Sequence, residues 1–334
     1  MSEVPASPTE LGAASSAPTA LSTQHLSVLY DETLAFLAPR AGARYIDGTV
    51  DGGGHAAGVL GASSPDGQLL GLDADPDALG RARARLAPYG DRARLVHANF
   101  RDLERCAREA GFAAVDGILL DLGLSSDTLE VSGRGFSFRR DEPLDMRFDP
   151  VAGESAAALL ADSTEAELRD VLRRYGEEPA AGRMARALVR ARAQAPLRTT
   201  GDLVGVVESV LGPPRGRTHP ATRTFQALRI AVNDELDSLE TALRAAVELL
   251  GPGGRLVVIA FHSLEDRIVK QFLRAESGGE CRCPPGLPVC VCARAPRLRL
   301  LTRKPVAPAA AEIERNPRAR SAKLRAAERM AVGS

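Results

Sequence analysis

Short apolar runs alternate with segments of helical periodicity from residue 44 to residue 121. Arg44–Asp47, Gln68–Asp73 and Val115–Asp121 have the pattern of strands that end in a carboxylate, and residues 94–97 form a further apolar run. After the second strand, Asp75 can cap a helix whose apolar residues recur at helical spacing. Repeated strand and helix alternation favours parallel strands joined by right-handed crossovers. The pattern therefore predicts an α/β fold with a doubly wound parallel sheet.

The alternation stops after Asp121 and resumes near residue 230. Leucine and valine then recur at helical spacing from Leu236, and we expect this helix to end at the Pro-Gly-Gly of residues 252–254. Residues 255–261 are almost entirely apolar, as in a central strand that is covered on both faces. Helical patterns fill the interval between the two halves, which indicates an inserted domain. We predict an N-terminal tail at 1–24, a discontinuous core at 25–125 and 230–334 with a basic C-terminal tail, and an inserted helical domain at 126–229.

Composition narrows the class of protein. The 43 Lys and Arg residues balance 43 Asp and Glu residues, so any basic surface must be local. No apolar run approaches the ~20 residues of a membrane-spanning helix, and the Ala, Ser, Thr and Pro of the first 24 residues do not resemble a secretory signal. We therefore expect a cytoplasmic protein without membrane contact. Eleven basic residues between Arg294 and Arg329 suit phosphate contacts, although a solvated tail has the same composition.

Five cysteines are too few for a disulfide scaffold. Cys281, Cys283, Cys290 and Cys292 lie close together, and four thiolates could hold a structural zinc ion. Their C-x-C pairs differ from the usual C-x₂-C spacing, so we expect reduced cysteines in a surface loop and predict no metal. Cys106 lies in a polar helical stretch and has the character of an inert thiol.

Polar and glycine residues follow successive strands of the predicted sheet. Ligands of open α/β sheets bind outside the carboxyl ends of the strands, where Asp47, residues 52–55, Asp73, residues 99–100 and Asp121 should converge. Consecutive glycines allow a close approach between backbone and ligand. Asp73 follows the glycine loop at the spacing of a carboxylate that accepts hydrogen bonds from the ribose of an adenosine cofactor.

Two ligands fit this arrangement, a dinucleotide and S-adenosylmethionine. Residues 52–57 match the loose G-x-G-x-x-A dinucleotide pattern, which alone is a weak signal. Asp47 and Asp51 would repel a pyrophosphate and suit a cationic sulfonium with its ammonium group. Residues 121–126 add a carboxylate and a tight polar turn. The structural alternatives are a tight connection for the glycines, a helix cap for the aspartates, a hydrogen-bonded loop histidine for His55 and a core residue for Phe100.

The sequence resembles the bacterial methyltransferases that modify the exocyclic N4 of a cytosine in the decoding region of 16S ribosomal RNA. The resemblance extends from His25 to Arg329 and includes several strings of six or more residues. The strings are residues 25–29 (HLSVL), 47–49 (DGT), 53–55 (GGH), 116–123 (DGILLDLG), 134–138 (RGFSF), 143–147 (PLDMR), 175–178 (YGEE), 219–229 (HPATRTFQALR), 261–267 (FHSLEDR) and 316–321 (NPRARS).

The resemblance implies a Rossmann-like S-adenosylmethionine-dependent methyltransferase core with an inserted helical domain. It implies 16S rRNA as partner, within a small ribosomal subunit or an assembly intermediate. The cofactor contacts that it implies are Gly53, Gly54, His55, Asp73, Phe100 and Asp121. Two residues depart from the family pattern: Asp51 replaces a usual Gly, and Thr128 replaces a common Gln that touches the cofactor. Thr128 keeps a hydroxyl but has a shorter reach.

Methyl transfer requires that the acceptor nitrogen, methyl carbon and sulfur lie in line. Acceptors that face the N4 hydrogens would help the amine react and take its proton, and Asp121 and Ser125 are the candidates. Asp121 could instead serve only the cofactor. Two segments have the basic and aromatic residues that hold an extruded base and its phosphates. The candidate RNA contacts are Arg134, Phe136, Arg147, Arg223 and Arg229, each of which could also be a loop or packing residue.

Two other functions remain open from the residues. One is a nicotinamide-dependent dehydrogenase, which S-adenosylmethionine binding without NAD binding would exclude. The other is a ribosome-assembly factor that uses a methyltransferase fold only to grip RNA. The carboxylates at successive strand ends argue against the second function, and transfer of a labelled methyl group would decide.

Overall fold

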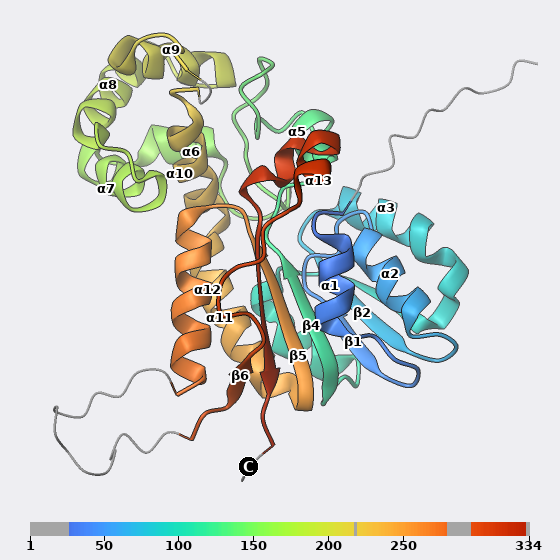
Figure 1. Cartoon of the computed structure of the whole chain (residues 1–334). Helices are drawn as coiled ribbons and strands as arrows, with labels where there is room; N and C mark the ends of the chain where they lie inside the picture. The colour runs from blue at the N-terminus through green and yellow to red at the C-terminus, as the bar shows by residue number, and fades with distance from the viewer. Residues whose placement is uncertain (1–26, 217–218, 279–294, 332–334) are drawn as a thin grey trace, which may run out of the picture.

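A seven-stranded sheet organises the protein, whose computed structural model describes residues 27–216, 219–278 and 295–331. The strands follow the order β3-β2-β1-β4-β5-β7-β6 (Figure 1). Strands β1 to β5 are parallel, whereas β7 runs antiparallel to both of its neighbours. The strands are β1 (Arg44–Asp47), β2 (Gln68–Asp73), β3 (Ala93–His97), β4 (Val115–Asp121), β5 (Leu250–Ala260), β6 (Leu298–Leu300) and β7 (Lys323–Arg329). The predicted α/β class with a parallel, doubly wound sheet is confirmed.

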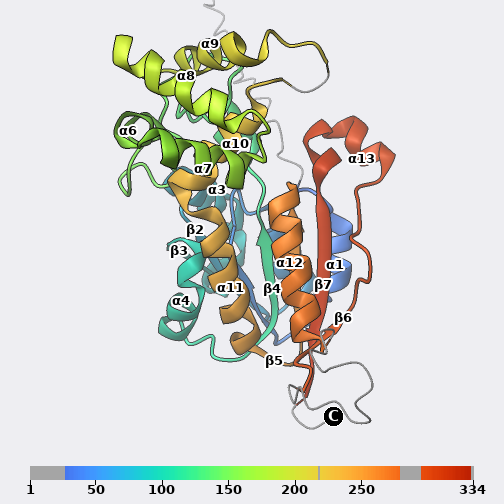
Figure 2. The ribbon, with the colours of Figure 1, turned by 90° about the vertical axis from the view of Figure 1, so that its left-hand side faces the viewer.

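Helices cover both faces of the sheet (Figure 2). α1 (Tyr30–Leu37), α2 (Gly54–Ala62) and α3 (Pro76–Leu86) share one apolar core with the strands. α4 (Leu103–Glu109), α11 (Glu235–Leu249) and α12 (Ser263–Glu276) share the core on the opposite face. The short elements of this layer arrangement are the 3₁₀ helices η1 (Ala87–Arg92), η2 (Phe100–Asp102) and η3 (Pro317–Ser321). The short α-helix α13 (Ala310–Arg315) precedes η3. Because both faces are covered, β4 and β5 are apolar on both sides, as their sequences indicate.

The predicted start of α3 is confirmed in detail. Asp75 precedes the helix, and its side chain accepts a hydrogen bond from the backbone N–H of Asp77. Pro76 occupies the first helical position, where its missing N–H costs no hydrogen bond. The cap places Asp75 directly after β2, so the side chain lies at the carboxyl end of the sheet.

A helical unit stands above the carboxyl end of the sheet, and all of it except its first helix lies at the upper left of Figure 1. Its helices are α5 (Ser126–Glu130), α6 (Ala156–Asp162), α7 (Glu165–Gly176), α8 (Ala181–Gln194), α9 (Thr200–Leu211) and α10 (Thr222–Asn233). It has a core of its own, which includes Leu168, Leu172, Met184 and Phe225. Asp234, with a left-handed backbone, joins α10 to α11 and returns the chain to the sheet.

Two predictions about the second half of the chain are wrong. β5 begins at Leu250, so Pro252, Gly253 and Gly254 lie inside a strand whose pairing with β4 shifts register there. The predicted basic C-terminal tail instead contains β6, α13, η3 and β7. Within β7, Arg325 is buried and its Nε donates to Asp266 Oδ1 over 2.7 Å, because this strand pairs with β5 inside the sheet.

Two further predictions fall on residues that the structure does not describe, namely the tail at 1–24 and the four clustered cysteines. Cys106 is described, and it is buried in α4 with its thiol free. In the described ranges 27–216, 219–278 and 295–331, none of the helices is long and apolar enough to cross a membrane.

Candidate active site

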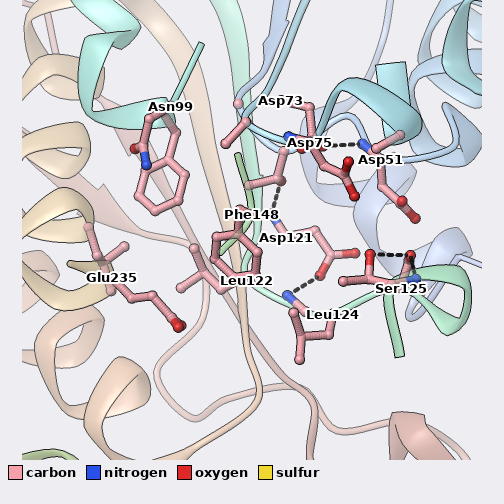
Figure 3. Close-up of a pocket in the computed structure, with 18 of the residues that line it drawn as sticks. Asp51, Asp73, Asp75, Asn99, Asp121, Leu122, Leu124, Ser125, Phe148 and Glu235 are labelled. Carbon is pink, nitrogen blue, oxygen red and sulfur yellow. Dashed lines mark hydrogen bonds between the residues drawn. The ribbon is translucent and has the colours of Figure 1, made fainter. Parts of the chain in front are cut away.

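A pocket opens at the carboxyl ends of β1 to β4, where the sheet meets the inserted helices (Figure 3). It encloses about 740 Å³ of space, part of it open to solvent. Its lining comes from strand ends, from the turn after β4, from the inserted segment and from α11 and α12. The lining residues are Gly48, Thr49, Asp51, Asp73, Ala74, Asp75, Ala78, Asn99, Phe100, Asp121, Leu122, Gly123, Leu124, Ser125, Thr128, Phe148, Glu235, Leu239 and Glu265.

The end of β1 lies beneath this pocket. Asp47 is almost fully buried, and its Oδ1 accepts the backbone N–H of Thr49 over 3.1 Å. Burial raises the pKa of Asp47 to about 7, while nearby His55 acts in the opposite direction. Gly48 follows, and a Cβ there would come within 2.6 Å of the Leu120 side chain. The backbone at this position therefore packs closely against the Leu120 side chain of β4.

Asp73 ends β2 with a carboxylate that faces the pocket. Its Oδ2 accepts the backbone N–H of Asp51, and its Oδ1 accepts the backbone N–H of Asp75, both over 2.8 Å. Burial raises the pKa of Asp73 to about 7, against the effect of these two hydrogen bonds. A carboxylate fixed in this way, with further lone pairs, can accept hydrogen bonds from a hydroxyl-bearing ligand.

The turn after β4 forms the opposite wall. The backbone N–H of Asp121 donates to Thr49 Oγ1 over 2.7 Å, and Asp121 Oδ1 accepts the N–H of Gly123 over 3.3 Å. His55 Nε2 lies 3.4 Å from the other oxygen, Oδ2, without the geometry of a hydrogen bond. Ser125 Oγ lies 2.9 Å from Thr128 Oγ1 and accepts the N–H of Thr128. The two hydroxyls therefore form one polar pair at the wall.

An apolar side of the pocket faces these carboxylates. Phe100 lies in η2, Leu122 follows β4 and Leu239 lies in α11, whereas Phe148 comes from the inserted domain. The Phe148 backbone N–H donates to Asn233 Oδ1 over 2.8 Å, and its ring stacks on Phe136 at 5.5 Å between centroids. Flat apolar surfaces of this kind suit an aromatic ring.

The structure brings together five of the predicted site residues, since Asp73, Phe100, Asp121, Ser125 and Thr128 all line the pocket. Gly53, Gly54 and His55 do not line it. Gly53 packs against α3, and a Cβ on Gly54 would lie 2.0 Å from Ser27 Oγ. His55 is buried behind Asp121 and stacks on Tyr30. Their contact with a cofactor stays a prediction.

The predicted RNA contacts have internal partners in most cases. Arg134 Nη2 bonds Asp75 Oδ2 at 2.6 Å, and Phe136 is buried. Arg147 makes two side-chain hydrogen bonds to Asp145. Arg229 pairs with both carboxylate oxygens of Glu235, at 2.8 and 2.9 Å. Arg223, in contrast, has an exposed side chain on α10.

Phe148, Glu235 and Glu265 also line the pocket, although none of them is among the site residues predicted from the sequence. Glu265 lies in the FHSLEDR string, which is a signal that could have indicated it. Its Oε2 accepts hydrogen bonds from the backbone N–H groups of Phe261 and His262, so Glu265 takes part in the cap at the start of α12. Phe148 and Glu235 carry no local signal, because only the packing of the inserted domain brings them to the pocket.

Glu235, His262 and Glu265 place one possible ligand atom each within 4.8 Å of one another. His262 Nε2 lies 3.0 Å from Glu265 Oε1. The Arg229 guanidinium already occupies both oxygens of Glu235 and supplies the positive charge that an ion would bring. We therefore assign no metal to this cluster.

The pocket fits S-adenosylmethionine better than a dinucleotide. Six carboxyl groups line it, from Asp51, Asp73, Asp75, Asp121, Glu235 and Glu265. Arg81, Arg134 and Arg229 compensate Asp51, Asp75 and Glu235, and no such arginine lines the pocket itself. The surface is thus acidic toward the ligand, which favours a sulfonium and an ammonium and disfavours a pyrophosphate. The apolar side can take the adenine ring.

Comparisons with known proteins agree with this chemistry. A family model described as the MraW methylase family matches residues 22–330. A protein of Thermomicrobium roseum named Ribosomal RNA small subunit methyltransferase H is 58% identical over 311 residues, which cover 93% of this chain and 95% of that protein. A protein of Geotalea uraniireducens with the same name is 53% identical over 310 residues, or 92% of this chain and 98% of that protein.

A solved structure titled as an rRNA methylase from Streptococcus thermophilus aligns with 90% of this chain and 95% of that one, at 12% identity. The TM-score of this alignment is 0.41.

Proposed function

Because the chain belongs to the MraW methylase family, we propose that it methylates the exocyclic N4 of a cytosine in the decoding region of 16S rRNA. S-adenosylmethionine is the cofactor of this methyltransferase. The acidic pocket with an apolar side at the strand ends is the observation that carries the proposal. We further propose that the reaction takes place in the cytoplasm, on a small ribosomal subunit or an assembly intermediate.

The cofactor supplies an electrophilic methyl group, and the chain's own residues hold it. Asp73 is the proposed acceptor for ribose hydroxyls, and Phe100 is the proposed contact of the adenine ring. Asp121 and Thr128 are assigned to the amino-acid end of the cofactor. Gly53, Gly54 and His55, which lie outside the pocket lining, are the further proposed contacts of the cofactor. The amino-acid end of the cofactor carries an ammonium group, which acidic side chains favour. The carboxyl groups of Asp47 and Asp121 both lie near His55, at the end of the site to which we assign this group.

Asp121 and Ser125 are the groups that we propose to face the acceptor amine. The lone pair of a cytosine N4 is delocalised into the ring, so acceptors for its hydrogens help the nitrogen to react. Among the described residues, the poorly aligned His55 Nε2 is the nearest donor to Asp121 Oδ2, so this oxygen can accept an N–H of the substrate. When the nitrogen takes the methyl group, the bond from that carbon to the sulfonium sulfur would break and release S-adenosylhomocysteine, and the amine would lose its proton to such an acceptor.

The inserted domain supplies the proposed RNA contacts. Arg223 is exposed and can reach a phosphate, and Arg147 is half-buried beside Asp145. Arg134, Phe136 and Arg229 are held inside, where they shape the wall that the base would meet. Their predicted role in RNA binding would therefore be indirect.

Methyl-transfer mapping tests the proposal. Small-subunit particles from cells that lack this protein are incubated with the purified protein and S-adenosylmethionine with a labelled methyl group, and the rRNA is then digested to nucleosides. We expect label in N4-methylated cytidine from one decoding-region position and none with Asp121→Ala. Label in another nucleoside, or at another position, would refute the proposed acceptor, and binding to particles without any transfer would favour an assembly factor.

A further inference from the structure

A second groove lies in the inserted domain, apart from the pocket at the strand ends. It is formed by the connection between α7 and α8, the first turns of α8, the end of α9 and the start of α10. The lining residues are Glu178, Pro179, Ala180, Gly182, Arg183, Arg186, Leu211, His219, Pro220 and Arg223. Figure 2 shows α7, α8 and α10 meeting in this region.

The groove presents positive charge. Arg183, Arg186 and Arg223 have exposed side chains. Arg183 has no ion pair with any residue in the described ranges, and Arg186 approaches Glu165 only to 3.9 Å. Glu178 is the one acidic lining residue; it is buried, and its Oε1 accepts the backbone N–H of Ala180 over 2.8 Å. The side chains that reach solvent in the groove are therefore cationic.

Two helices, α8 and α10, begin at this groove. Ala180 and Ala221 are the cap residues of α8 and α10, and neither offers a side chain to cap the first turn. The first turn of a helix and its dipole favour an anion nearby. His219 Nδ1 accepts the N–H of Ala221, so Nε2 carries the hydrogen; this Nε2 lies 3.5 Å from Glu208 Oε1, and the ring stacks on Phe138 at 4.6 Å between centroids.

The groove adjoins the pocket through one layer of contacts. Glu177, next to Glu178, accepts hydrogen bonds from Ser263 Oγ over 2.6 Å and from Arg267 Nη2 over 2.8 Å. Ser263 begins α12, and Glu265, two residues later, lines the pocket. An extended strand with one base in the pocket can therefore place a neighbouring backbone group near Arg223.

We propose that this groove binds a phosphodiester of the RNA strand that carries the methylated base. The inference rests on the proposed function for the identity of that strand. An extruded base must be held by contacts to neighbouring phosphates, and guanidinium groups with helix N–H groups provide such contacts. Arg183 and Arg186 hold the phosphate from α8, while Arg223 holds it from α10.

The test compares two double variants with the same change in charge. Arg183→Gln with Arg186→Gln removes the α8 side of the groove. Arg173→Gln with Arg190→Gln removes two exposed arginines of the same domain that do not line it. The fluorescence anisotropy of a labelled single-stranded decoding-region oligoribonucleotide gives the affinity at several salt concentrations, and calorimetry gives the affinity for S-adenosylmethionine.

We expect the groove variant to bind the oligoribonucleotide about tenfold more weakly, with a salt slope that is smaller by about 0.7 for each lost contact. The control variant should resemble the wild type, and both should bind S-adenosylmethionine normally. Equal weakening by the two variants would overturn the groove as a site, as would unchanged binding by both. If the wild type methylates no rRNA, the proposed function fails, and the anisotropy comparison still decides whether the groove binds RNA.

Discussion

Asp73 combines burial with two backbone hydrogen bonds, and its ionisation should control cofactor binding. Its pKa of about 7 means that the carboxylate is only partly ionised in the ligand-free protein near neutral pH. Ribose hydroxyls donate most strongly to the ionised form. We therefore expect the affinity for S-adenosylhomocysteine to rise between pH 6 and pH 8, as measured by calorimetry.

The matched variant for this prediction is Asp73→Asn. It should bind the ligand about 10- to 100-fold more weakly at pH 8, which corresponds to about 1.5–3 kcal/mol for hydrogen bonds to a charged group. The part of the pH dependence that belongs to Asp73 should disappear, whereas any titration of the ligand itself persists. A variant that retains the full pH dependence would show that another group controls binding.

Asp47 affects stability in a direction that follows from its raised pKa. A carboxyl group whose pKa is raised to about 7 by folding stabilises the folded state fully below its unfolded pKa near 4 and loses that contribution as the pH rises to about 7. Urea unfolding of the ligand-free protein should therefore show a fall in the free energy of unfolding from this group between pH 4 and pH 7. Asp47→Asn, which keeps an oxygen for the Thr49 N–H, should show a smaller fall; an equal fall would exclude Asp47 as the cause.

The identity of the site residues was predictable where the strand itself fixes their position. Asp73 and Asp121 end strands, so topology alone brings them to one pocket. The role of a charged residue in the inserted domain was not predictable, because its partner is remote in sequence. Arg134 pairs with Asp75, 59 positions away, and no local pattern marks that pair.

At the scale of elements, the end of α7 packs tightly on the start of α10. A Cβ at Gly176 would lie 2.7 Å from the backbone oxygen of Arg223 and 3.2 Å from the Ala227 Cβ. Since the first contact is backbone, Gly176→Ala should force the helices apart and cost about 1–3 kcal/mol in the free energy of unfolding. Urea denaturation measures this loss.

Gly205 provides the control for that prediction. It is exposed inside α9 of the same domain, and a Cβ there would meet nothing within 4 Å. Gly205→Ala should therefore leave packing unchanged and stabilise the helix by about 0.5–1 kcal/mol. If both alanine variants changed stability in the same direction, close packing would not be the cause at Gly176.

Elements with a local pattern were predictable, and elements that depend on pairing were not. The bounds of β1, β2 and β4 match the apolar runs because each run ends in an aspartate next to polar or glycine residues. β7 contains Lys323, Arg325 and Arg329, and these charges suggested a basic tail suited to phosphate contacts. Only pairing with β5 and neutralisation by Asp266 allow such a segment to lie inside the sheet.

For the whole molecule, the buried pair of Arg134 with Asp75 joins the inserted domain to the sheet. The side chains are 11% and 6% exposed, and the Arg134 guanidinium also donates to the carbonyl oxygens of Arg147 and Phe148. Arg134→Ala would leave a buried carboxylate without its cation. We expect a loss of about 3–5 kcal/mol in the free energy of unfolding, measured by urea denaturation.

Two further variants test the cause of that loss. Arg140→Ala removes an exposed arginine 3.5 Å from Glu142 and should change stability by less than about 1 kcal/mol. Adding Asp75→Asn to Arg134→Ala should recover part of the stability, because the unpaired charge is gone. A double variant as unstable as the sum of the single ones would indicate that the two side chains act independently.

The presence of an inserted helical unit was predictable from the interruption of strands between residues 121 and 250. The placement of this helical unit against the pocket was not predictable from the sequence. Phe148 and Glu235 reach the pocket only because Asn233 holds both ends of the insertion: its side chain donates to the carbonyl oxygen of Met146 and accepts the N–H of Phe148. This contact spans about 85 positions of the chain, beyond any periodic signal.

The antiparallel β7 also bears on the order of synthesis. β5 pairs on one side with β4 and on the other with a segment that emerges more than sixty residues later. Until residues 323–329 have left the ribosome, the nascent chain exposes an apolar strand with unsatisfied backbone groups, a state that invites association between chains. Release of the last segment is therefore the step that completes the core, and shortening the chain before β7 should yield aggregated protein rather than a smaller soluble enzyme.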